Sequence, residues 1–182
     1  MRRLSRGTRR RRSWAASASG NGKTTVARAL AARLDVPFVE LDALHHGPNW
    51  AEPTADEFRA RVDPIVKTDA WVIDGAYRNK LGDLVLERAD LVVWLDLPLH
   101  VWLPRLLRRT ALRVVRREEL WAGNRERLRD VLHPHNSVVL YALRGYRRRR
   151  QAYASELARF SLARLCTQAE VDDFLRNAAR ET

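Results

Sequence analysis

The stretch SASGNGKTT, Ser17–Thr25, decides the fold. From Ser17 to Thr24 it follows the spacing G-x-x-x-x-G-K-[ST] of a phosphate-binding loop, with serine in place of the first glycine. In such a loop glycines bring backbone N–H groups onto phosphate oxygens, lysine neutralises them and the hydroxyl binds Mg²⁺. A purely structural turn at a helix start is the alternative. The residues expected to bind the nucleotide are Ser19, Gly20, Asn21, Gly22, Lys23, Thr24 and Thr25.

The residues before the loop do not resemble the strand that normally leads into one. Seven arginines lie between residues 2 and 12, where Leu4 is the single large apolar side chain. Burying an unpaired arginine costs several kcal/mol, so we expect a degraded first strand, at best a short one at Ser13–Ser17. Residues 1–16 are therefore expected to be a separate basic segment before a domain at 17–182. A disordered tail, a targeting segment, a phosphate-binding arm and a shifted reading frame are the alternatives.

After the loop, apolar strand-like runs alternate with helical patterns. The expected strands are PFVELD, WVIDG, DLVVWLDLP and RFSLARLC. The expected helices follow the loop, begin at Thr54 and Thr167 with capping boxes, and cover about 100–117 and 137–157. This order predicts a three-layer α/β domain with a mainly parallel sheet of about five strands.

Composition limits the class of protein. The chain is 46% hydrophobic with six tryptophans, which favours a packed core, and the single Cys166 excludes an internal disulfide. No apolar run approaches the ~20 residues of a membrane span. We therefore expect a cytoplasmic protein without a membrane partner. The formal charge of +12 owes much to the first twelve residues, so the rest of the chain is moderately basic.

Three acids, Asp42, Asp74 and Asp96, follow expected strands. Ligands of a parallel sheet bind beyond the carboxyl ends of its strands, so these side chains should meet at one rim. A loop cap at Asp42 and a turn at Asp96 are the structural alternatives.

Several segments carry a family resemblance. VIDGAYR, with Asp74, Gly75 and Arg78, resembles the D-G-[FY]-P-R segment of adenylate kinase-like enzymes, with Ala76 and Tyr77 standing where phenylalanine and proline usually come. With the loop and ADLVVWLDLP it looks like a nucleoside-monophosphate-kinase-type P-loop fold. ELDALHHGPNW, WVIDGAY and REELWAGNRERLRD resemble more closely the bacterial DNA topology modulation proteins. The resemblance runs from about Ser17 to the C-terminus.

The resemblance implies a division of roles. Lys23 would span the β- and γ-phosphates of ATP, Thr24 would ligate Mg²⁺ and Asp74 would hold metal-bound water. Asp42 would orient or deprotonate the acceptor hydroxyl.

Arginines in the region 105–130, where such enzymes place a lid, could stabilise phosphoryl oxygens. Arg109 and Arg117, with Arg78, are the expected catalytic arginines, and a solvated helix surface is the alternative. The run at 147–150 is expected to be exposed. His45 and His46 have no Cys or carboxylate at a metal-ligand spacing and are read as substrate-loop residues. Trp50 and Trp121 are expected to border a planar acceptor or to lie in the core.

Two functions follow from these patterns. The first is a Mg²⁺- and ATP-dependent phosphotransferase acting on a nucleotide or a small hydroxylated molecule. The alternative is a non-catalytic, nucleotide-dependent DNA-binding regulator that contacts nucleic acid weakly through its arginines. The sequence does not identify the acceptor, because ELDALHHGPNW lacks the monophosphate-binding helix of adenylate kinases.

Overall fold

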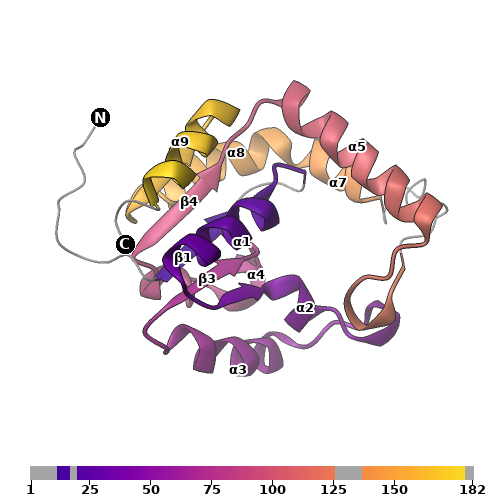
Figure 1. Ribbon diagram of the computed structural model, residues 1–182. Coiled ribbons are helices and arrows are strands. Elements are labelled where there is room, and N and C mark those ends of the chain that lie inside the picture. Colours follow the sequence, from indigo (N-terminus) through magenta and orange to yellow (C-terminus); the bar gives the residue numbers. More distant parts are fainter. Residues whose placement is uncertain (1–11, 17–19, 126–136, 179–182) are drawn as a thin grey trace.

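A computed structural model describes residues 12–16, 20–125 and 137–178 (Figure 1). Its centre is one sheet of five parallel strands in the order β2-β3-β1-β4-β5. The strands are β1 Arg12–Ala16, β2 Phe38–Glu40, β3 Trp71–Asp74, β4 Leu91–Leu95 and β5 Leu162–Leu165. The expected mainly parallel, three-layer α/β fold is confirmed.

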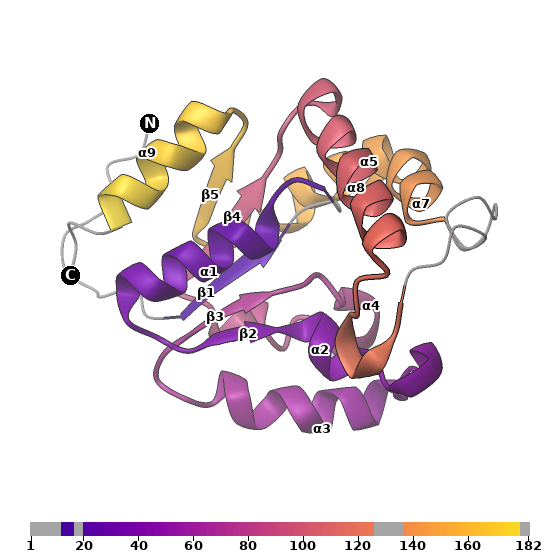
Figure 2. The ribbon, with the colours of Figure 1, turned by 45° about the vertical axis from the view of Figure 1, so that its right-hand side comes forward.

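Helices cover both faces of the sheet (Figure 2). The α-helices are α1 Lys23–Leu34, α2 Leu41–His45, α3 Ala55–Val66, α4 Arg78–Leu81, α5 Leu99–Arg116, α7 Val138–Arg144, α8 Tyr146–Glu156 and α9 Gln168–Ala178. Three short 3₁₀ turns are η1 Pro48–Trp50, η2 Leu86–Arg88 and η3 Trp121–Gly123. Side chains of α1 and α9 pack on one face, and those of α3, α4 and α8 pack on the other. None of the helices described here has the length and apolar character needed to cross a bilayer.

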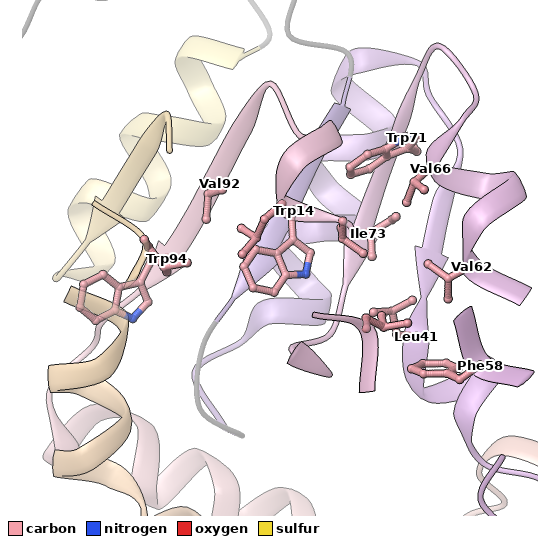
Figure 3. Close-up of a cluster of buried hydrophobic side chains, with 13 residues drawn as sticks. Trp14, Leu41, Phe58, Val62, Val66, Trp71, Ile73, Val92 and Trp94 are labelled. Atoms are coloured by element: carbon pink, nitrogen blue, oxygen red, sulfur yellow. The ribbon is translucent and has the colours of Figure 1, made fainter. Parts of the chain in front are cut away.

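The two cores follow from the alternation of side chains along the buried strands. Trp14, Ile73 and Val92 point to the α3 side, where they pack with Phe58 and other apolar residues of that layer (Figure 3). Ala15 and its neighbours in β3 and β4 point to the α1 side. A parallel strand of this kind is apolar on both faces, which is why β3 and β4 were recognisable in the sequence.

The first strand is short but central, with β3 on one side and β4 on the other. Trp14 and Ala15 are 2% and 3% exposed, so this strand belongs to the core. Its arginine does not need to be buried: the Arg12 side chain is 36% exposed and contacts Asp90 at 2.9 Å. The observed strand starts one residue before the expected Ser13–Ser17 stub. The sheet therefore includes residues 12–16. Residues 1–11 lie outside the described part.

Local signals in the sequence account for several helix ends. Thr54 and Glu57 form the expected capping box at α3, and Thr167 and Glu170 form the second one before α9. The single helix expected over 137–157 is divided at Gly145 into α7 and α8. Glycine has the greatest backbone freedom and the poorest helix propensity of the residues there, which explains the division.

Candidate nucleotide and acceptor site

The phosphate loop joins the end of β1 to the start of α1. Its described part, Gly20 to Thr25, contains two glycines with φ of +89° at Gly20 and +84° at Gly22, a conformation that side chains other than glycine rarely adopt. A Cβ on Gly20 would lie 2.8 Å from the Cβ of Leu106, so the loop also rests closely against α5. The expected nucleotide residue Ser19 lies outside the described residues, as does Ser17.

Lys23 and Thr24 occupy the first turn of α1. The hydroxyl of Thr24 donates a hydrogen bond of 2.5 Å to Oδ2 of Asp74 at the end of β3. The first turn contains no acidic residue, and its N-cap residue, Gly22, makes no side-chain capping hydrogen bond. Its backbone N–H groups and the positive end of the helix dipole are therefore oriented for an anion.

Asp74 is buried beside this helix end, with only 4% of its surface exposed. Burial raises the pKa of Asp74, while the charge of Lys23 and the hydrogen bond from Thr24 act in the opposite direction. Its Oδ1 is buried and has no hydrogen-bond partner within the described part of the chain. A buried carboxylate oxygen with a free lone pair next to a threonine hydroxyl matches the oxygen ligands that Mg²⁺ prefers.

Gly75 brings the end of β3 against α2. Its φ is +132°, and a Cβ at this position would lie 2.8 Å from the Cβ of Leu41. Its carbonyl accepts a 2.5 Å hydrogen bond from Nε1 of Trp14. Only glycine permits this approach, and the approach places Asp42, the neighbour of Leu41, close enough to raise the pKa of Asp74 electrostatically.

Asp42 is held by a residue that the sequence did not single out for a role. The hydroxyl of Tyr77 donates to Oδ1 of Asp42 at 2.6 Å. Burial and the charge of Asp42 raise the pKa of Tyr77, so this hydroxyl keeps its proton. Tyr77 stands where the resembling segment has proline, and that departure was the available signal for a distinct role.

Aromatic residues gather around the loop that follows Asp42. The His46 ring lies 5.2 Å from that of Trp50 and 5.5 Å from that of Trp121, which belongs to η3 far along the chain. Trp50 and Trp121, expected to border a planar acceptor or to lie in the core, thus meet at the same histidine. Both border His46, and Trp50 is 38% exposed.

Asn124 connects these two segments, and sequence reasoning missed it. Its Oδ1 accepts from the backbone N–H of Trp50 at 3.0 Å, and its Nδ2 donates to the carbonyl of Gly47 at 2.8 Å. Asn49 and Trp50 both have positive φ, at 56° and 59°, which is uncommon for these residues. The side chain of Asn124 therefore stabilises a strained loop and attaches the segment after α5 to it (Figure 2).

The three expected catalytic arginines lie on α4 and on α5 or at its C-terminal end. Arg78 forms ion pairs with Asp83, at 2.6 Å, and with Glu156, so it connects α4 to α8. Arg109 lies half-buried on α5, and Arg117 is exposed at the end of that helix with φ +48°.

Asp96 has a structural role that differs from the expected turn. It is 5% exposed, and its carboxylate contacts Arg150 and Arg164. Arg150 is exposed, as expected, with 45% of its side chain accessible, and its guanidinium also connects α8 to the end of β4. Both contacts join residues that are 54 and 68 positions apart, so local sequence patterns could not predict them.

Comparisons with known proteins agree with this geometry. The family model of the AAA ATPases, the ATPase family associated with various cellular activities, matches residues 16–74, which hold the loop, Asp42 and Asp74. The comparison with curated protein sequences gives no match.

Three solved structures share the fold over most of their length. A shikimate kinase from Bacteroides thetaiotaomicron is 15% identical with a TM-score of 0.53, and covers 92% of this chain and 95% of its own. A shikimate kinase from Acinetobacter baumannii, in complex with shikimate, is 19% identical with a TM-score of 0.55 and coverages of 91% and 88%. A gluconokinase from Sinorhizobium meliloti is 19% identical with a TM-score of 0.51 and coverages of 93% and 89%. The chain therefore shares the fold of these small-molecule kinases, and its residues 16–74 match the AAA ATPase family model.

Proposed function

We propose that this protein is a Mg²⁺-dependent phosphotransferase that moves the γ-phosphoryl group of ATP to a small hydroxylated acceptor or a nucleotide. One observation carries the proposal. Thr24 donates to Asp74 directly beside Lys23, and the second oxygen of Asp74 is buried with no described partner. A structural turn has no need for a buried carboxylate at this place, because burial of an unpaired acid costs free energy.

Some residues then bind the nucleotide and the metal, and others bind the acceptor. Lys23 and the N–H groups of the first turn of α1 bind the phosphates, and Thr24 with Asp74 holds the metal. The Mg²⁺ ion, when bound, neutralises charge on the phosphate oxygens. Because the site has few groups for covalent chemistry, positioning and charge supply most of the rate.

Asp42 accepts the proton of the attacking hydroxyl, or orients that hydroxyl, at the acceptor end. Its Oδ1 is already bonded to Tyr77, which holds the carboxylate in one orientation. Arg109 and Arg117 remain proposed partners of the phosphoryl oxygens. Arg78 would first have to leave Asp83 and Glu156.

The acceptor class is inferred from the similar structures. The names shikimate kinase and gluconokinase of the similar structures favour a small hydroxylated acceptor, although identities of 15% and 19% carry the fold and not the substrate. The finer likeness to topology modulation proteins, and the DNA-binding role it suggests, rests on sequence segments and on the charge of +12. Several described arginines are paired with acids, which lowers the basic charge available to nucleic acid.

Transfer from radiolabelled ATP tests the proposal across a panel of polyols, hydroxy acids and nucleotides. We expect labelled product with at least one acceptor in the presence of Mg²⁺, and loss of product in Lys23→Ala. Lys67→Ala, at the residue directly after α3, is the matched control. Equal ATP affinity and turnover in folded Lys23→Ala would refute the loop assignment. ATP binding without any transfer, together with DNA binding, would favour the regulator.

A further inference from the structure

Two histidines and a glutamate lie together at the acceptor loop, the segment 46–52 between α2 and α3 that contains Trp50. His45 ends α2, His46 follows it, and Glu52 comes after η1. One ligand atom of each lies within 4.8 Å of the other two, and His45 Nε2 is 3.6 Å from Glu52 Oε2. Glu52 supplies the carboxylate that the sequence spacing did not reveal. The turn η1, between His46 and Glu52, brings it back to the histidines.

His45 is a buried imidazole whose nitrogens have no hydrogen bond. The residue is 2% exposed, and neither Nδ1 nor Nε2 has a hydrogen-bond partner among the residues described. Its ring stacks on Tyr77 at 4.3 Å and meets the edge of Phe58 at 5.1 Å. An unsatisfied buried polar group costs about 1–3 kcal/mol, so this arrangement favours a ligand that accepts the lone pair of the ring.

Burial, together with the charge of Lys80, lowers the pKa of His45. Metal ions bind the neutral form of imidazole.

The hydrogen bonds of Tyr77 determine which ring nitrogen of His46 carries the proton. The single hydroxyl proton of Tyr77 is donated to Asp42, so the 3.4 Å contact between this oxygen and Nε2 of His46 requires His46 to donate. The lone pair of His46 is then on Nδ1, which is buried and has no hydrogen-bond partner in the described part. Metal-binding histidines commonly donate their other N–H in this way.

Glu52 completes the set with a charged oxygen. Its side chain is 55% exposed, and Lys80 Nζ contacts Oε2 at 2.9 Å. This hydrogen bond lowers the pKa of Glu52, so the carboxylate is ionised at neutral pH. Two neutral imidazoles and one carboxylate are a ligand set for borderline metals, and they leave coordination positions open for water or a ligand.

We propose that His45, His46 and Glu52 bind a divalent transition metal of the Zn²⁺ type. Its ligand set differs from the oxygen ligands of Thr24 and Asp74, because imidazole ligands select such metals over Mg²⁺. The bound ion ties α2 to the segment after η1, and Glu52 shares its carboxylate between the ion and Lys80. The ion thereby holds the loop on which Trp50 and Asn124 meet.

Titration of the full chain with Co²⁺ tests the site without any need for turnover. Excess Mg²⁺ is present to occupy oxygen sites, and visible d–d absorption reports four- or five-coordinate Co²⁺, which absorbs far more strongly than the octahedral ion. We expect saturation at about one equivalent and displacement by Zn²⁺. Absence of this absorption overturns the proposal.

Variants assign the absorption to the three residues. Glu52→Gln should weaken Co²⁺ binding by about tenfold or more, and its exposure means that the fold is retained. His45→Gln should remove the absorption, as checked on the folded fraction by circular dichroism. Glu87→Gln, an exposed acid on η2, and Asp74→Asn should bind Co²⁺ like the parent. Unchanged affinity in Glu52→Gln and His45→Gln would place the metal on other ligands and overturn the proposal, whatever the outcome of the ATP assays.

Discussion

Replacing Trp14 by alanine tests whether the short first strand carries the fold. Trp14 is 2% exposed at the centre of the sheet and packs with Ile73, Val92 and the α3 layer (Figure 3). Removing a buried aromatic ring of this size costs about 3–5 kcal/mol of unfolding free energy. Loss of the hydrogen bond to Gly75 adds about 1 kcal/mol and leaves that buried carbonyl without its partner. A loss of about 4–6 kcal/mol is a large share of the ~5–15 kcal/mol typical of a domain.

Urea unfolding followed by circular dichroism measures this loss, with equal m-values showing that the midpoint shift is a stability change. Trp14→Phe keeps most of the apolar volume and should lose only about 1–2 kcal/mol, chiefly through the hydrogen bond. Trp50→Ala is the control, because Trp50 is 38% exposed and lies outside the core clusters. A loss below ~1 kcal/mol in Trp14→Ala would show that β1 does not occupy the centre of the sheet.

Three further predictions concern the site. Asp74→Asn should raise the Mg²⁺ concentration needed for activity. It should also stabilise the metal-free protein at pH 7, because a carboxyl whose folded pKa is raised contributes stability below its unfolded pKa and loses it as pH rises through the folded value. The stability difference should therefore shrink in acid, and equal urea midpoints of parent and variant at both pH values would contradict this account. Asp42→Asn should lower turnover by ~10²-fold or more and leave ATP affinity nearly unchanged, as measured by initial rates. Tyr77→Phe should show a smaller loss of turnover. Weakened ATP binding in Asp42→Asn would place Asp42 at the nucleotide instead. Asn124→Ala should raise the acceptor KM more than the ATP KM, because the loop loses its bonds at Gly47 and Trp50, whereas equal changes in both constants would speak against an acceptor-side role.

The fold class was predictable because its signals are local. Val92 and its neighbours form a continuous apolar strand, Gly22 and Lys23 mark the turn into a helix, and Thr54 with Glu57 marks a helix start. Each of these patterns acts over a few residues. The first strand was the difficult element, because its five residues carry only one large apolar side chain and follow a run of arginines. Its pairing with both β3 and β4, rather than its own composition, explains its place in the sheet.

The residues of the candidate site also fall into those predictable from local sequence and those placed by tertiary contacts. The sequence by itself determined the turn into α1, since Gly20, Gly22, Lys23 and Thr24 lie close together in the chain. The structure gives both glycines a positive φ. It also predicted two acids at strand ends; Asp74 does end β3, whereas Asp42 lies in α2, two residues after the end of β2. Only the tertiary structure decided that Tyr77 holds Asp42, that Glu52 joins the two histidines and that Asn124 fastens the segment after α5 to the acceptor loop. Such contacts join residues up to 77 positions apart, and they depend on strand order and helix packing, which no local pattern specifies.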